Sequence, residues 1–113
     1  MKALDLLLSF AAIAIGVLHS FIVAPQVYDA LTQDAFWFFA AGLSIIYMGL
    51  LNVLRALYGG RVPALRWTAF GVSVVMFAFA AVFAMTQDEF ANPVLIAQLT
   101  IYGGLMVMAL VRR

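Results

Sequence analysis

The sequence predicts an all-α integral membrane protein, a four-helix bundle whose helices run up, down, up and down. The first observation is a set of four runs without a charged residue, at 6–28, 35–54, 67–87 and 90–111. Each run reaches the roughly 20 residues that a helix needs to cross a hydrocarbon core about 30 Å thick. The second is composition: with 67% hydrophobic and 10% charged residues, 113 residues hold more apolar side chains than a soluble interior could bury.

The third observation is that proline, glycine and asparagine residues, which end or begin helices, lie at the links between the runs. Pro25 is expected to close the first helix, Gly60 and Pro63 to lie in the second link, and Asn92 and Pro93 to open the fourth helix. Links this short force neighbouring helices to be antiparallel. We therefore expect one transmembrane domain over residues 1–113, with helices at about 4–25, 34–56, 64–87 and 92–111.

The charged residues predict how the chain is oriented. The basic residues all fall on one side of the predicted membrane, and they are Lys2, Arg55, Arg61, Arg66, Arg112 and Arg113. The two links on the other side carry only acids, namely Asp29, Asp34, Asp88 and Glu89. Because Lys and Arg in short loops stay inside, we expect a multi-pass protein of the bacterial inner membrane with both termini cytoplasmic.

Composition also excludes several chemistries. The chain contains no cysteine, so it forms no disulfide, thiolate nucleophile or Cys-ligated metal centre. Its basic residues are scattered rather than gathered into a phosphate-binding face, so we expect no nucleic-acid partner. We find no Gly-rich phosphate loop, no pair of buried carboxylates and no metal-ligand spacing, and we therefore predict no catalytic residue and no metal site.

An internal repeat at an offset of about 55 residues suggests two duplicated parallel hairpins. The matching strings are Gly16-Val17 with Gly71-Val72, Thr32-Gln33-Asp34 with Thr86-Gln87-Asp88, and Ile46-Tyr47-x-Gly49-Leu50 with Ile101-Tyr102-x-Gly104-Leu105. The alternative is coincidence, since apolar chains share many short strings.

Small and polar residues at spacings of three and four predict which helix faces pack together, because helices in lipid associate through close backbone approach and interhelical hydrogen bonds. The predicted seams are Asp5, Ser9, Ala12, Gly16, His19 and Val23; Phe38, Gly42, Ile45, Gly49 and Asn52; Ala69, Ser73, Met76, Ala80 and Ala84; and Ala97, Ile101, Gly104 and Met108. Asp5 is expected to be a solvated residue of the first helical turn, near Asn52 and within reach of Arg55 or Arg66.

His19 is the titratable side chain deepest within a run, about 10 Å below the outer boundary by the helix rise. Residues at a similar depth or deeper give a candidate ligand- or partner-binding cluster of His19, Ser20, Ser44, Gln98, Tyr47 and Tyr102. Ionisable groups inside a membrane are expensive and often functional. The competing interpretation is structural: a neutral imidazole can hydrogen-bond Gln98 or a backbone carbonyl and lock two helices together.

Two short patterns resemble a family of small bacterial four-helix membrane proteins that is catalogued as a domain of unknown function. They are Gly16-x-x-His19 in the first run, and Phe36-Trp37-Phe38 with Gly42 and Gly49 in the second. The resemblance implies a four-helix inner-membrane protein and draws attention to His19 and the 36–38 segment. It implies no substrate, cofactor or catalytic residue.

Three functions remain open. The leading one is a non-catalytic accessory or interaction subunit, or a bundle that binds a lipid-like ligand, with the bilayer, another membrane protein or a second copy of the chain as partner. The second is an oligomeric small-solute transporter or channel gated by His19. The third is an electron-transfer subunit with haem on His19, which would need a Met or a second copy's His19 as the other axial ligand. No cofactor is otherwise predicted.

Overall fold

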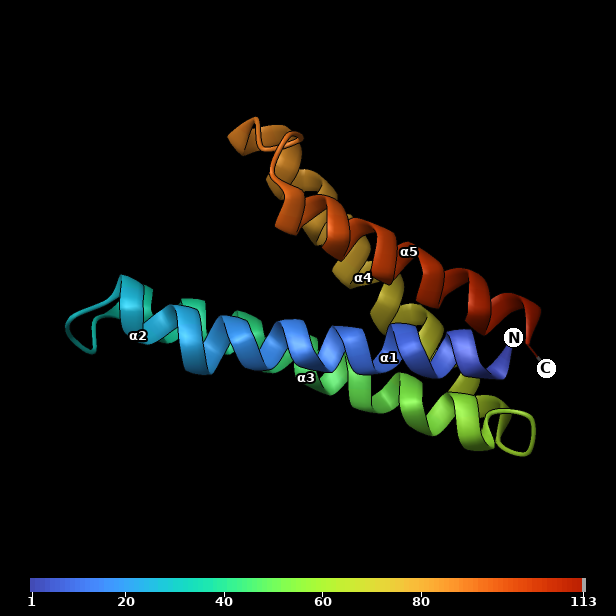
Figure 1. Cartoon of the computed structure of the whole chain (residues 1–113). Coiled ribbons are helices and arrows are strands. Elements are labelled where there is room, and N and C mark those ends of the chain that lie inside the picture. The colour runs from blue at the N-terminus through green and yellow to red at the C-terminus, as the bar shows by residue number, and fades with distance from the viewer. Residues whose placement is uncertain (113) are drawn as a thin grey trace.

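The computed structural model describes residues 1–112 and contains four long helices (Figure 1). The first is continuous through α1 (Lys2–Val17), the π-helical segment η1 (Leu18–Val23) and α2 (Ala24–Val27). It is followed by α3 (Gln33–Tyr58), α4 (Pro63–Gln87) and α5 (Pro93–Val111). All four are long and apolar enough to span a membrane, which confirms the predicted all-α fold. Arg113, one of the six basic residues, lies outside the described residues.

The helix ends agree with the predicted ones to within one or two residues and have local causes. Thr32 begins α3 with its hydroxyl accepting a hydrogen bond from the Ala35 amide at 3.2 Å, and Asn92 begins α5 in the same manner. The expectation that Pro25 closes the first helix is wrong, because the helix continues to Val27. Pro25 lies two residues after the end of the π-helical segment, and such local adjustments accommodate proline within transmembrane helices.

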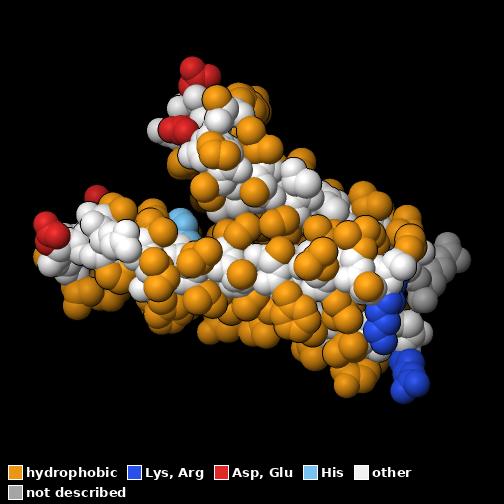
Figure 2. All heavy atoms as spheres, in the orientation of Figure 1, with side chains coloured by type: hydrophobic (Ala, Val, Ile, Leu, Met, Phe, Trp, Pro, Cys, Tyr) orange, Lys and Arg blue, Asp and Glu red, His pale blue; other side chains and the backbone are white. Residues whose placement is uncertain are grey.

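The helices form two antiparallel hairpins, α1–η1–α2 with α3 and α4 with α5 (Figure 1). Met1, the α3–α4 turn and the end of α5 lie together at what we call the basic end. The α2–α3 and α4–α5 turns form the acidic end, where Figure 2 shows the carboxylates at the tips of the two hairpins. The two hairpins meet at the basic end and diverge towards the acidic end, so that the molecule has the outline of a V.

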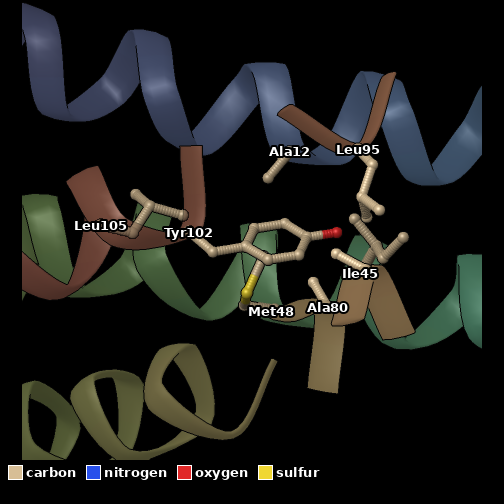
Figure 3. Close-up of a cluster of buried hydrophobic side chains, with 8 residues drawn as sticks. Ala12, Ile45, Met48, Ala80, Leu95, Tyr102 and Leu105 are labelled. Atoms are coloured by element: carbon tan, nitrogen blue, oxygen red, sulfur yellow. The ribbon is translucent and has the colours of Figure 1, made fainter. Parts of the chain in front are cut away.

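The hydrophobic core lies where the arms of the V meet. The ring of Tyr102 on α5 reaches from its helix into the space between the hairpins and packs among Ala12, Ile45, Met48 and Leu105 (Figure 3). Tyr102 is 1% exposed. This large side chain holds the hairpins together at the middle of their length.

The contact between α1 and α3 is close because glycines face each other across it. A Cβ atom at Gly16 would lie 2.7 Å from the Gly42 carbonyl oxygen, and one at Gly42 would collide with the Ser20 hydroxyl. A Cβ at Gly49 would lie 2.9 Å from the Ser9 carbonyl oxygen. Glycine at these positions lets the two backbones touch, as in other helix pairs in lipid.

The predicted packing seams are correct on α3 and α4 for most positions and wrong in part on the other two helices. On the first helix the buried positions after Gly16 are Ser20 and Ala24, whereas Val23 is 40% exposed. The wider i→i+5 turn of η1 causes this change of spacing. On α5, Ala97 is exposed. This helix instead buries the larger side chains of Leu95, Tyr102 and Leu105, which fill the space between the hairpins.

The internal repeat stays a prediction, and its matched positions have different surroundings. Tyr47 is 65% exposed, whereas its counterpart Tyr102 is buried. Gly16 contacts α3 closely, whereas a Cβ atom at Gly71 would have no described atom within 4 Å other than those of its own helical turn.

Candidate functional site: the crevice between the hairpins

The diverging hairpins enclose a crevice of about 670 Å³ between η1 and α3 on one side and α4 and α5 on the other. Figure 2 shows it as a notch between the two arms, with the imidazole of His19 near its base. We call it the inter-hairpin crevice. Its floor is shared with the core, since Ile45, Ala80, Leu95 and Tyr102 belong to both.

The π-helical segment η1 determines where His19 lies. π turns are rare within α-helices, and many of those that are known lie at functional sites. The imidazole stacks on the ring of Phe38 from α3, with 3.9 Å between the ring centroids and 13° between the planes. The next residue, Ser20, contacts the backbone of α3, where its hydroxyl donates a hydrogen bond of 2.7 Å to the Phe39 carbonyl oxygen.

Two buried polar atoms at the crevice have no hydrogen-bond partner among the described residues: His19 Nε2 and Tyr102 Oη. Both residues line the crevice. In Figure 3 the Tyr102 hydroxyl points into the gap between Ile45 and Leu95. Leaving a buried polar group unpaired costs about 1–3 kcal/mol, so both atoms are places where a bound group would gain an interaction.

The structure brings together four of the six candidate residues from the sequence. His19, Ser44, Gln98 and Tyr102 all line the crevice. Ser20 does not line it, because its hydroxyl is turned towards α3; it lines a smaller pocket of about 450 Å³ near the α2–α3 turn. Tyr47 lies outside the crevice too, and its side chain is 65% exposed.

The aromatic walls of the crevice were not predicted as a unit. Trp37 and Phe38 come from α3, and Phe79 and Phe83 come from α4. The signal in the sequence is an adjacent aromatic pair on α3 and a pair four residues apart on α4, but in a membrane protein such pairs also suit a lipid-facing surface. None of the described residues that line the crevice is Asp, Glu, Lys or Arg, so its interior has no formal charge and is mostly apolar.

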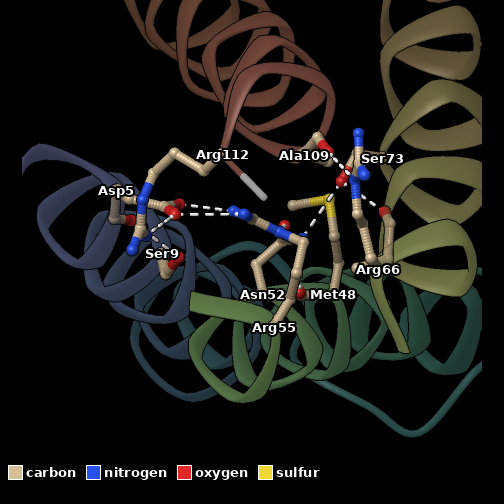
Figure 4. Close-up of polar contacts among 10 residues, drawn as sticks. Asp5, Ser9, Met48, Asn52, Arg55, Arg66, Ser73, Ala109 and Arg112 are labelled. Carbon is tan, nitrogen blue, oxygen red and sulfur yellow. Dashed lines mark hydrogen bonds and ion pairs between the residues drawn. The ribbon is translucent and has the colours of Figure 1, made fainter. Parts of the chain in front are cut away.

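The basic end is closed by a polar network that contains the expected neighbours Asp5, Asn52 and Arg55, but the network is buried, which was not expected. Asp5 is fully buried rather than solvated, and its carboxylate forms ion pairs with Arg55 and Arg112. Arg55 approaches it with both terminal nitrogens, and the Nη1 to Oδ2 distance is 3.0 Å (Figure 4). Asp5 falls at the convergence of the hairpins, where a carboxylate is shielded from water by the helices around it.

The network continues into α4. Arg55 Nε donates a hydrogen bond to Asn52 Oδ1 at 3.0 Å, and Asn52 Nδ2 donates to the Ser73 hydroxyl at 3.0 Å. The basic-end network of Asp5, Asn52, Arg55, Ser73 and Arg112 thus connects α1, α3, α4 and the chain after α5 (Figure 4).

Of the two arginines expected within reach of Asp5, Arg55 contacts it and Arg66 makes a separate contact. Its guanidinium donates to the carbonyl oxygens of Ala109 and Leu110, at 2.7 and 2.8 Å. These are carbonyls of the last turn of α5, which lack a partner within their own helix. Arg66 therefore fastens α4 to the end of α5.

Together the fold and the crevice define a small multi-pass membrane protein. Ion pairs join its two hairpins at the basic end, and towards the acidic end the hairpins enclose a mostly apolar crevice. Two polar atoms in this crevice have no hydrogen-bond partner among the described residues. Comparison of the chain with models of protein families, with curated proteins and with solved structures found no match. The resemblance of the Gly16-x-x-His19 and Phe36-Trp37-Phe38 patterns to a family of small four-helix membrane proteins stays a prediction.

Proposed function

We propose that this protein is a non-catalytic binding protein of the membrane that holds a lipid-like ligand in the inter-hairpin crevice. The observation that carries the proposal is the combination of an apolar crevice with two buried, unpartnered polar atoms, His19 Nε2 and Tyr102 Oη. Ligand sites are typically apolar and concave with a few polar groups that orient the ligand.

The size of the crevice favours a small amphiphile over a helix of another protein. A helix about 10–12 Å across occupies about 400–600 Å³ per turn of 5.4 Å. The crevice of about 670 Å³ therefore holds little more than one turn. The same volume lies in the range of about 300–1,000 Å³ that is usual for small-molecule sites.

The position of the crevice favours entry from the bilayer. Phe79 and Phe83 on its wall are 69% and 47% exposed, and in a membrane these rings contact lipid. A hydrophobic ligand can therefore move from the bilayer into the crevice without passing through water. At the opposite end, the basic-end network and the packed core block a continuous path through one protomer, which favours binding over conduction.

The distribution of charged residues supports one orientation of the chain in the membrane. We place the chain in a bacterial inner membrane with the basic end at the cytoplasmic face, because Lys and Arg in short links are retained there. The crevice then opens in the outer leaflet.

The proposal is tested by crosslinking in native membranes. A photoreactive benzoylphenylalanine replaces Phe79 in the crevice wall or, as a matched control, Phe10, which is 56% exposed on α1 and does not line the crevice. We expect one discrete low-molecular-weight adduct at position 79, identified by mass spectrometry, and only a mixture of bulk lipids at position 10. A protein adduct at position 79, or the same lipid mixture at both positions, would overturn the proposal.

A second arm fills the crevice. Ala41 lines it, whereas Ala78 on α4 is exposed and does not. Ala41→Phe should abolish the discrete adduct at position 79 and the co-purification of its ligand, and Ala78→Phe should leave both unchanged. Retention of the ligand in Ala41→Phe would place it elsewhere on the protein.

A further inference from the structure

The chemical class of the ligand follows from the depth, charge and shape of the inter-hairpin crevice, and this inference rests on the binding function proposed above. His19 lies eight residues before the end of the first helix at Val27, and Tyr102 nine residues after the start of α5 at Pro93. At 1.5 Å per residue both lie roughly 12–14 Å below the acidic end. The unpartnered atoms are therefore within the hydrocarbon part of the membrane.

That depth argues against a phospholipid as the specific ligand. A phospholipid keeps its charged and ester groups near the headgroup layer and inserts only hydrocarbon chains. Methylene groups would then face His19 Nε2 and Tyr102 Oη and would leave both atoms unpaired, at a cost of about 1–3 kcal/mol each. A matching ligand carries its hydrogen-bonding group at the buried end.

The walls add two further requirements. No described side chain that lines the crevice is formally charged, so the buried group of the ligand is uncharged. Phe38 is already stacked with His19, and Trp37, Phe79 and Phe83 supply further aromatic surfaces. Aromatic side chains pack favourably on other planar rings, offset or edge to face.

We infer that the ligand belongs to the quinone class, with an uncharged ring that bears carbonyl groups and an apolar isoprenoid or alkyl tail. The ring lies at the floor of the crevice and the tail extends into lipid. Its carbonyl oxygens accept hydrogen bonds from the Tyr102 hydroxyl and from His19 in the tautomer that carries its proton on Nε2. The Tyr102 hydroxyl is flanked by Ile45 and Leu95 (Figure 3). The ligand ring therefore has to displace these aliphatic side chains as it enters.

The placement of the two tryptophans allows a direct binding measurement. Trp37 lines the crevice, and Trp67 lies on the first turns of α4 near the basic end. Quinones quench tryptophan fluorescence at short range. In lipid nanodiscs, a decyl-tailed benzoquinone should quench Trp37 saturably in the Trp67→Phe protein, and should leave Trp67 nearly unquenched in the Trp37→Phe protein.

Variants of the two polar atoms then test the hydrogen bonds. In the Trp67→Phe background, Tyr102→Phe and His19→Phe should each weaken quinone binding about threefold to tenfold, as expected for one lost hydrogen bond. Tyr47→Phe, which removes an exposed hydroxyl outside the crevice, should leave the affinity unchanged. Circular dichroism and gel filtration identify any variant that has lost its fold.

Competition separates this inference from the proposed function. Decylbenzene, which has the ring and tail without carbonyls, should displace the quinone only weakly. Equal competition by decylbenzene, or unchanged quinone affinity in both Tyr102→Phe and His19→Phe, would overturn the quinone class. The lipid adduct at position 79 would still support the proposed function in that case. Absence of both saturable quenching and a discrete adduct would overturn both.

Discussion

Arg55 on α3 and Asp5 on α1 form a buried ion pair in which two guanidinium nitrogens contact the two carboxylate oxygens. The side chains are 2% and 0% exposed, although the residues are 50 positions apart in the chain. Paired Arg and carboxylate groups of this geometry combine charge with directional hydrogen bonds. This contact joins the first two helices at the end where the hairpins also converge.

Loss of one partner in this pair should destabilise the protein strongly. Arg55→Met leaves the Asp5 carboxylate buried with less compensation, and breaking a buried pair in this way costs about 3–5 kcal/mol. We expect a clearly lower midpoint of unfolding in detergent, followed by circular dichroism. Arg61→Met is the matched control, since it also removes one positive charge from the basic end but at an exposed position of the α3–α4 turn. Equal stability of the two variants would contradict a stabilising role of the pair.

The glycine contact between α1 and α3 predicts an asymmetric response to alanine. Gly42→Ala places a methyl group against the Ser20 hydroxyl and 2.9 Å from the Gly16 carbonyl oxygen, so the helices must separate. Such overpacking costs about 1–3 kcal/mol. Gly71→Ala adds its methyl group where, beyond its own helical turn, no atom of the described residues lies within 4 Å, and it should be neutral or slightly stabilising. Thermal unfolding of both variants measures the difference. Similar unfolding midpoints would show that α1 and α3 are packed less closely than the structure indicates.

Tyr102→Phe should not destabilise the ligand-free protein. The hydroxyl has no partner among the described residues, so its removal takes away an unpaired buried group and keeps the ring that fills the core. The free energy of unfolding of delipidated protein should stay equal or rise by up to about 1–3 kcal/mol. Tyr47→Phe removes an exposed hydroxyl and provides the baseline. A loss of stability in Tyr102→Phe alone would mean that the hydroxyl is paired in the ligand-free state.

The orientation that we propose for the chain predicts a labelling pattern. Because the protein contains no cysteine, single cysteines can be placed in each turn without a prior deletion. Leu31→Cys and Ala91→Cys at the acidic end should react with a membrane-impermeant maleimide in intact spheroplasts. The links at this end carry no Lys or Arg, the residues that retain a short link on the cytoplasmic side. Gly60→Cys at the basic end should react only after permeabilisation. Labelling of Gly60 and Ala91 from the same side would overturn the four-span topology.

The first helix illustrates how far periodicity alone can predict packing. Its buried positions as far as Gly16 were predicted by spacings of three and four, and the structure confirms them. Beyond Gly16 the π-helical segment changes the spacing, so Ser20 and Ala24 replace His19 and Val23 on the buried face. Pro25, two residues after this segment, is a local signal for such an adjustment, but the contact in which Ser20 donates to the Phe39 carbonyl is made with α3 and cannot be predicted from the first helix alone.

The sequence by itself determined the number of helices, their approximate ends and the segregation of basic and acidic turns. These properties are local or additive: an uncharged run of sufficient length partitions into lipid wherever its neighbours lie, and proline, glycine and capping residues act within one turn. It also placed His19, Ser44, Gln98 and Tyr102 at compatible depths, because the rise per residue of a helix is constant.

Only the tertiary structure decided that Asp5 is buried between Arg55 and Arg112, that the hairpins diverge, and that Tyr102 rather than Tyr47 turns inward. Each of these depends on the rotation of a helix about its axis and on the angle at which two hairpins cross. Those quantities are set by the sum of many small packing contacts between residues distant in the chain, such as Asp5 with Arg112 across 107 positions.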